Sequence, residues 1–281
     1  MGPKLSSLEM LHRATAREGD TGAVPRTLMV FAHVDDETIA LGARLHRFGS
    51  AHLVHVTDGA PKNEHDSRAH GFSSLADYRA ARVAELGCVL QLAGVGAMSR
   101  ECLGIPDQET SLQLVELARA LAARIERHRP EVIFTHPYEG GHPDHDACAF
   151  GVRYAVEIAR IRPEPLVVEA VFYHAGPHGI ETAEFLAPPQ PTGEVFYELS
   201  PAEQQTKAAL IACFRSQQQT LQGFSLTHER FRIAPRYDFT TPPAAAVFYD
   251  RFPWGMTAQR FCELATLAEA SLRQETGAAC P

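Results

Sequence analysis

Short apolar runs alternate with stretches of helical periodicity in the first two thirds of the chain. Residues 27–32 and 51–57 are apolar and rich in β-branched side chains, which predicts two buried strands. Between them, apolar residues recur at helical spacing over residues 38–48, and Gly49 is placed to end that helix. A strand–helix–strand unit of about 30 residues predicts parallel strands with a right-handed crossover.

The alternation continues to about residue 176 and then weakens. Strands are predicted at residues 131–135 and 167–173, helices at 75–92, 112–127, 147–161, 201–221 and 261–273, and a long polar loop at 62–72. The simplest fold is α/β: a Rossmann-like, doubly wound, mostly parallel sheet with helices on both faces. Residues 177–281 would form an irregular and helical C-terminal extension. Residues 1–26 would be an N-terminal arm with a short helix near residues 7–16.

Composition narrows the class of protein. The chain has 281 residues, 45% of them hydrophobic and 21% charged, which is ample for one α/β domain over residues 27–281. A net charge of −8 argues against nucleic acid as a partner. No apolar run approaches the roughly 18 residues of a membrane span, and the first 26 residues lack the apolar core of a secretory signal.

The six cysteines are scattered and form no CxxC pair, so reduced thiols and a cytoplasmic location are expected. Cysteine-based metal binding and cysteine nucleophiles have no local support in the sequence. A homo-oligomer is compatible with these properties.

A cluster of ionisable residues follows the first predicted strand: His33, Asp35, Asp36 and Glu37. Adjacent residues there point in different directions, so one aspartate could bind a metal ion while the other faces a substrate. Imidazole with carboxylate suits Zn²⁺ or a similar divalent ion. Alone, the cluster reads equally well as a helix start, with Asp35 as N-cap and the other acids favouring the helix dipole.

A second cluster, His142-Pro143-Asp144-His145, follows the strand at residues 131–135. Pro143 disfavours the helical conformation for His142 and is itself favoured at the first helical position. We therefore expect His142 on the approach loop and Asp144 and His145 in the first helical turn. Asp144 could accept a hydrogen bond from an imidazole and fix its tautomer. The alternative is a capped helix start with solvent-exposed histidines.

Both clusters should meet at one edge of a parallel sheet, because each follows a strand. His33, His145 and one of the two aspartates would then form a two-histidine, one-carboxylate metal site with an open position. The remaining carboxylate could take a proton from water, and His142 could donate one to a leaving group. These groups suffice to hydrolyse an amide or ester without a covalent intermediate.

The clusters resemble the PIG-L/LmbE-type N-deacetylase family, whose hallmarks are an AHPDDE-like and an HPDH segment. The resemblance extends to Thr57-Asp58-Gly59, residues 82–86 and 103–107, and Ser216-Gln217. It implies a metal-dependent hydrolase that removes the acetyl group from an N-acetylated amino sugar or its conjugate, with Zn²⁺, or Fe²⁺ instead. Two positions depart from the family pattern: Val34 replaces a proline, and Phe214 stands where relatives often have histidine.

The resemblance also implies roles for individual residues. His33, Asp36 and His145 would be metal ligands and Asp35 the general base. His142 would be the acid or oxyanion stabiliser, with Asp144 orienting it.

Several other residues have weaker assignments. Arg68 and Tyr138 are candidates for substrate contact. His55 is expected in the core, His136 is expected to be structural rather than part of the site, and Trp254 is expected to pack the C-terminal segment. Two other functions remain open: a metal-dependent phosphoesterase or other amidase on the same residues, and a non-catalytic binding protein with a degenerate site.

Overall fold

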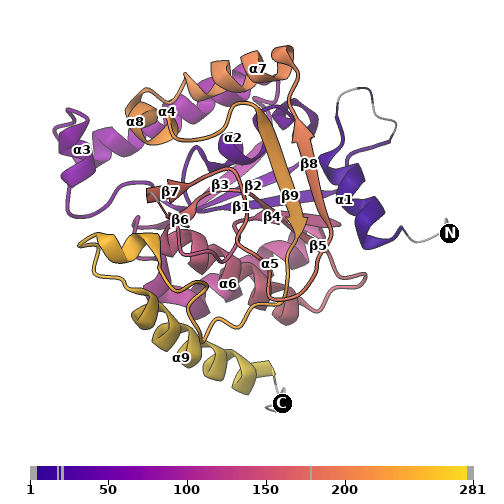
Figure 1. Ribbon diagram of the computed structural model, residues 1–281, viewed down its shortest axis with the longest axis vertical. Helices are drawn as coiled ribbons and strands as arrows, with labels where there is room; N and C mark the ends of the chain where they lie inside the picture. Colours follow the sequence, from indigo (N-terminus) through magenta and orange to yellow (C-terminus); the bar gives the residue numbers. More distant parts are fainter. Residues whose placement is uncertain (1–4, 18, 20–21, 178, 277–281) are drawn as a thin grey trace.

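The computed structural model describes residues 5–17, 19, 22–177 and 179–276 (Figure 1). A seven-stranded sheet in the order β3-β2-β1-β4-β5-β9-β8 runs through it. The first five strands in this order are parallel: β3 (Ser99–Ile105), β2 (His52–Thr57), β1 (Thr27–Phe31), β4 (Val132–Thr135) and β5 (Leu166–Ala170). Two strands joined by antiparallel pairing complete the sheet: β9 (His228–Ile233) pairs with β5, and β8 (Glu194–Glu198) pairs with β9. The α/β, mostly parallel fold expected from the sequence is thus confirmed.

Helices cover both faces of the sheet (Figure 1). One layer contains α2 (Asp36–Leu41), α4 (Leu75–Leu92) and α7 (Pro201–Ile211); the other contains α5 (Leu114–His128), α6 (Pro143–Ala159) and α9 (Ala258–Thr276). Alternate side chains of β1 point to opposite faces of the sheet and pack against different helix layers. Leu28 and Val30 pack with α5 and α6, and Met29 and Phe31 pack with α2 and α4. A strand that is buried on both faces has a continuous apolar run in its sequence, which is why β1 could be predicted from the sequence.

Shorter elements fill the connections. They are α1 (Ser7–Thr15), α3 (His65–Ala69), α8 (Gln218–Leu221), the hairpin β6 (His174–Gly176) and β7 (Gly179–Glu181), and 3₁₀ turns at Leu45–Phe48, Thr110–Gln113, Arg215–Gln217 and Phe248–Arg251. Helix α1 confirms the short helix predicted in the N-terminal arm. Its Leu11 and Ala14 are fully buried against the core. The division into an arm and one catalytic domain stays a prediction.

Some sequence-based boundaries were wrong. The helix predicted at 38–48 divides into α2 and a 3₁₀ turn. Gly49 is the C-cap of that turn, as predicted, in a right-handed conformation with φ −57°. The loop at 62–72 contains α3, and the helix at 201–221 breaks after Ile211. Strands β3, β8 and β9 were missed because they are rich in charged residues. In β3 the burial alternates between exposed and half-buried, as on a sheet edge.

The order of strands reverses between β1 and β4. From β1 the chain moves outward through β2 and β3, then crosses back to β4 on the other side of β1. In open α/β sheets, ligands bind at the carboxyl ends of the strands where the order reverses in this way. Both ionisable clusters follow the two strands that flank this point.

Candidate active site

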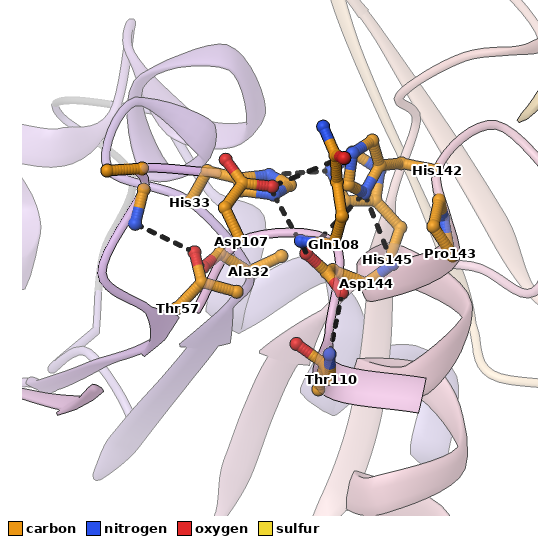
Figure 2. A network of polar contacts seen from close by, with 12 residues as sticks. Ala32, His33, Thr57, Asp107, Gln108, Thr110, His142, Pro143, Asp144 and His145 are labelled. Carbon is orange, nitrogen blue, oxygen red and sulfur yellow. Dashed lines mark hydrogen bonds and ion pairs between the residues drawn. The ribbon is translucent and has the colours of Figure 1, made fainter. Parts of the chain in front are cut away.

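The two clusters meet at the carboxyl ends of β1 and β4, as the sequence predicted (Figure 2). His33 follows β1, and Asp36 is the first residue of α2. His142 is the N-cap of α6 with an extended backbone, and Pro143 is its first helical residue. His145 therefore projects from the first turn of α6 toward His33.

His33, Asp36 and His145 form a compact donor set. His33 Nδ1 lies 3.3 Å from His145 Nε2 and 3.5 Å from Asp36 Oδ2. Asp36 Oδ1 lies 3.6 Å from His145 Nε2. All three side chains are buried, and each offers an atom within 4.8 Å of the others. Two imidazoles and a carboxylate converging in this way fit a divalent metal ion.

The surroundings keep Asp36 ionised and oriented. Burial alone would raise the pKa of Asp36, but His136 and His145 hold it well below its usual range. Asp36 Oδ2 also accepts a hydrogen bond of 2.7 Å from the backbone N–H of His33. One oxygen thus fixes the turn, and the other faces His145.

Asp35 has a different environment from its neighbour. Its φ is 136° and its ψ is −23°, which is rare for any residue with a side chain. Its Oδ2 pairs with the buried guanidinium of Arg82 at 3.0 Å. Asp35 occupies the N-cap position of α2, as the alternative interpretation had it, but within the described chain its side chain makes no capping hydrogen bond. Burial raises the pKa of Asp35 to about 8, although Arg82 opposes the shift.

Hydrogen bonding determines where His142 carries its proton. The backbone N–H of Asp144 donates to His142 Nδ1 at 3.2 Å. Since Nδ1 accepts, the neutral imidazole holds its proton on Nε2, which lies 3.9 Å from Asp107 Oδ1. Burial lowers the pKa of His142 to about 3. His142 is therefore a neutral donor directed into the site.

The Asp144 carboxylate is used mainly to fix the segment after β3. It accepts hydrogen bonds from the backbone of Gln108 at 2.6 Å and of Thr110 at 3.0 Å, drawn as dashed lines in Figure 2. Its Oδ2 approaches His142 Nδ1 only to 3.8 Å. Asp144 thus contacts His142 most closely through its backbone N–H, whereas the sequence suggested its carboxylate.

Three residues at the site were not assigned to it from the sequence. Asp107 Oδ1 lies 3.2 Å from His33 Nε2, and His136 Nε2 lies 3.2 Å from Asp36 Oδ2. The His136 ring also stacks on the ring of His145, with 3.9 Å between the ring centroids. The third residue is Arg82, which pairs with Asp35. His136 follows β4 directly, so its position at a strand end was the available signal, although a structural role was favoured.

Other candidates lie away from the donor set. The Tyr138 hydroxyl donates to the Thr241 carbonyl at 2.9 Å and the ring packs near Phe261, which does not favour the predicted substrate contact. Arg68 pairs with Glu64 at 2.5 Å on α3, and its side chain is 76% exposed. A role for Arg68 in substrate binding stays a prediction.

The remaining residues singled out in the sequence have clear positions. His55 Nε2 contacts Glu37 at 3.0 Å in the core, which confirms its structural role. Phe214 is fully buried in the core, and Val34 is buried with its carbonyl bonded to Arg82. Trp254 packs on Phe252 as expected. Its ring also lies 5.0 Å from that of His142, a contact the sequence did not predict.

Across the described residues, no helix combines the length and apolar character needed to cross a bilayer.

Comparison with known proteins defines the class. Residues 28–156 match the PIG-L family model, described as GlcNAc-PI de-N-acetylase, which confirms over this region the family resemblance seen in the sequence. A 1D-myo-inositol 2-acetamido-2-deoxy-alpha-D-glucopyranoside deacetylase 2 of Catenulispora acidiphila is 29% identical over 215 residues, covering 66% of this chain and 68% of the relative. A deacetylase of the same substrate name from Nakamurella multipartita is 30% identical over 196 residues, covering 60% and 65%.

Solved structures share the fold. A deacetylase of the teicoplanin biosynthesis pathway matches with a TM-score of 0.58 at 18% identity, covering 76% of this chain and 99% of that one. The N,N'-diacetylchitobiose deacetylase of Pyrococcus horikoshii matches with a TM-score of 0.53 at 19% identity, covering 75% and 84%. These likenesses concern the fold. The chain spans about two thirds of the length of the two curated relatives.

Proposed function

We propose that this protein is a divalent-metal-dependent hydrolase that removes the acetyl group from an N-acetylated amino sugar or a conjugate of one. The convergence of His33, Asp36 and His145 beside the separately held Asp35 is the observation that carries the proposal. The names of the curated relatives support the amino-sugar substrate. A cytoplasmic location and a homo-oligomeric state stay predictions from the sequence.

The donor set would hold the ion through His33, Asp36 and His145. Zn²⁺ suits two imidazoles and one carboxylate, and Fe²⁺ suits them as well. A bound ion of this kind polarises the amide carbonyl and makes water more acidic, which is the chemistry that the side chains alone lack.

The proton transfers and the oxyanion contact fall to two side chains on opposite segments. Asp35 takes the proton of the attacking water. Arg82 favours the ionised form of Asp35, and a cation bound by the neighbouring donor set would favour it further. His142 donates a hydrogen bond from Nε2 to the developing oxyanion, and Asp35 passes the proton that it has taken from water to the departing amine. Asp144 positions His142 through its backbone N–H and holds the segment that carries Asp107.

An acetate-release assay with zinc-loaded protein, across a panel of N-acetylated sugars, tests the proposal. Asp35→Asn should lower the rate by about 10²- to 10⁴-fold, the typical contribution of a general base. Its zinc content, measured by elemental analysis, should stay equal to that of the wild type. Glu157→Gln is the matched control, because it makes the same kind of change, from carboxylate to amide, at an exposed residue near the C-terminal end of α6, away from the site. Full activity of Asp35→Asn, or of metal-free protein, would refute the mechanism.

A phosphoesterase is the second candidate, because His33 also belongs to a neighbouring donor group with Asp107, His142 and Asp144. Two metal ions side by side are typical of phosphoester hydrolysis. Both Asp144 oxygens already accept backbone hydrogen bonds, however, which favours a single ion. Release of phosphate from a phosphorylated sugar, without release of acetate, would establish the alternative. Purified protein that binds no zinc at micromolar concentrations would instead indicate a degenerate, non-catalytic site.

A further inference from the structure

Helix α4 is joined to the corner after α7 by polar contacts spaced along one side of the helix. Tyr78 accepts a hydrogen bond of 2.6 Å from the Gln217 side chain. Glu85 accepts two from Ser216, at 2.9 Å from the backbone and 2.6 Å from the hydroxyl. The contact next along the helix joins two cysteines. We call this row of contacts the α4 seam.

The two cysteines of the seam are Cys88 on α4 and Cys213 just after α7. Their sulfur atoms lie 3.0 Å apart although the residues are 125 positions apart in the chain. A disulfide bond is about 2.05 Å long, so roughly 1 Å separates this contact from a bond. Glu85 is one helical turn from Cys88, so the Ser216 contacts fix the backbone on both sides of the thiols.

Solvent can reach the pair. Cys88 is exposed and Cys213 is half-buried. The structure therefore combines the two requirements of a redox-active pair: sulfur atoms already in contact, and access for a small oxidant. Cys102 is also exposed, but its Sγ contacts the carbonyl of Thr57 rather than another thiol.

We propose that Cys88 and Cys213 form a modification site, in which exchange with a low-molecular-weight disulfide such as oxidised glutathione joins them in a reversible intramolecular bond. The thiolate of Cys88 attacks one sulfur of oxidised glutathione and releases a glutathione thiolate. Cys213 then gives up its proton and attacks the Cys88 sulfur of the mixed disulfide, which releases the second glutathione. The protein loses two protons and two electrons, and two molecules of reduced glutathione form.

The order of attack follows from the surroundings of the thiols. Burial and the neighbouring Cys88 raise the pKa of Cys213 to about 11, whereas Cys88 is the exposed thiol. Once Cys88 is in the mixed disulfide, its contribution to that shift is gone, and Cys213 becomes the resolving thiol.

The bond would fasten α4 to the α7 corner and close a long loop in the unfolded chain. Closing a loop of this length stabilises the folded state through the entropy of the unfolded chain. Helix α4 also carries Arg82, which holds Asp35, Val34 and the Gly59 carbonyl. Oxidation would therefore hold this side of the site more firmly, and the inference stands whatever the substrate is.

The test uses the full-length protein incubated with oxidised glutathione and then denatured for a thiol count. The count should fall by two, from the six cysteines of the sequence to four, and dithiothreitol should restore it. Peptide mapping should find Cys88 linked to Cys213. The oxidised protein should melt several degrees higher than the reduced protein.

Two variants make the outcome decisive. Cys88→Ser should lose both the linked peptide and the rise in melting temperature, while Cys102→Ser should behave as the wild type. An unchanged thiol count would overturn the proposal. A stable glutathione adduct on Cys88 without a disulfide to Cys213 would also overturn it, because Cys213 would then be unable to attack the mixed disulfide.

Discussion

Asp35 and Asp36 are neighbours in the chain, yet the structure places them in opposite electrostatic surroundings. Two histidines face Asp36 and hold its pKa well below the usual range despite burial, whereas burial raises the pKa of Asp35 to about 8. The unusual φ of 136° at Asp35 turns the two side chains apart. Two carboxylates in different environments can take different roles, and in the proposed mechanism the metal ligand and the general base would lie one peptide bond apart.

Gly141, just before His142, is required by the space around it. A Cβ at this position would lie 2.0 Å from the carbonyl oxygen of Tyr173. Gly141→Ala should therefore displace the loop that carries His142 and lower the free energy of unfolding by about 2 kcal/mol or more. Urea denaturation measures the change, and acetate release should fall with it.

Gly87→Ala is the matched control for this substitution. Gly87 lies within α4, and no atom lies within 4 Å of the Cβ it would gain. Alanine there should stabilise the protein by about 0.5 to 1 kcal/mol. Equal stability of the two variants would show that the contact with Tyr173 does not constrain the loop.

For single residues, the sequence predicted those site residues whose type and neighbouring pattern indicate a strand end or a helix start. His33, His142 and His145 were found because each lies beside a predicted strand end or helix start. Asp107 and Arg82 reach the site from the segment after β3 and from α4. Both lie in segments covered by the family resemblance, but the sequence pattern does not report their tertiary contacts. The Tyr138 hydroxyl donates to the Thr241 carbonyl, because a residue on the same loop can still turn into the core, and its contact with substrate stays a prediction.

Among the elements, the edge pair β2 and β3 shows how a polar strand is held. Glu101 on β3 bonds to Arg124 of α5 at 2.8 Å and to His52 of β2 at 2.8 Å. These contacts tie strand, neighbouring strand and covering helix together. They also explain why β3 escaped detection, because its charged residues serve cross-element contacts instead of forming an apolar run.

This arrangement predicts a pH-dependent stability. Hydrogen bonds from Arg124 and His52 lower the pKa of Glu101 from 4.5 to about 2. A lowered pKa means that the stabilisation is complete above pH 4.5 and is lost as the pH falls toward 2. Glu101→Gln should therefore cost up to about 1 kcal/mol at pH 7, the upper range for a partly exposed pair. The difference from the wild type should shrink on acidification.

Denaturation at a series of pH values measures this difference. Glu126→Gln is the control, because Glu126 is an exposed residue on the same helix as Arg124. A cost for Glu101→Gln that is constant from pH 7 to pH 3 would contradict the assignment.

Across the whole molecule, Arg232 connects the C-terminal segment to the site. From β9 its buried guanidinium bonds to Glu169 of β5 at 2.7 Å and to Glu139 at 2.9 Å. Glu139 lies on the loop that leads to His142. The Tyr237 hydroxyl completes the group by donating to Glu169 at 2.8 Å. Strand β9, which the sequence missed, thus holds the loop that carries the catalytic candidates.

Removing this cation should leave two buried carboxylates without their partner. Arg232→Met should lower the free energy of unfolding by about 3 to 5 kcal/mol. Adding Glu139→Gln and Glu169→Gln to the same chain should recover part of that loss, because no uncompensated charge would remain. Thermal and urea denaturation of the single and triple variants measure both effects. No recovery in the triple variant would show that shape, not charge, dominates at this position.

The crossing of the chain from β3 back to β4 has a consequence for synthesis on the ribosome. His145 emerges 112 residues after His33, which at about 5–20 residues per second is an interval of roughly 6 to 22 s. Throughout that interval the nascent chain displays only His33 and Asp36, two of the three residues of the proposed donor set. Ion capture must therefore wait until β4 has docked beside β1. Any product terminated before residue 143 would carry the first half of the motif without the means to retain a metal.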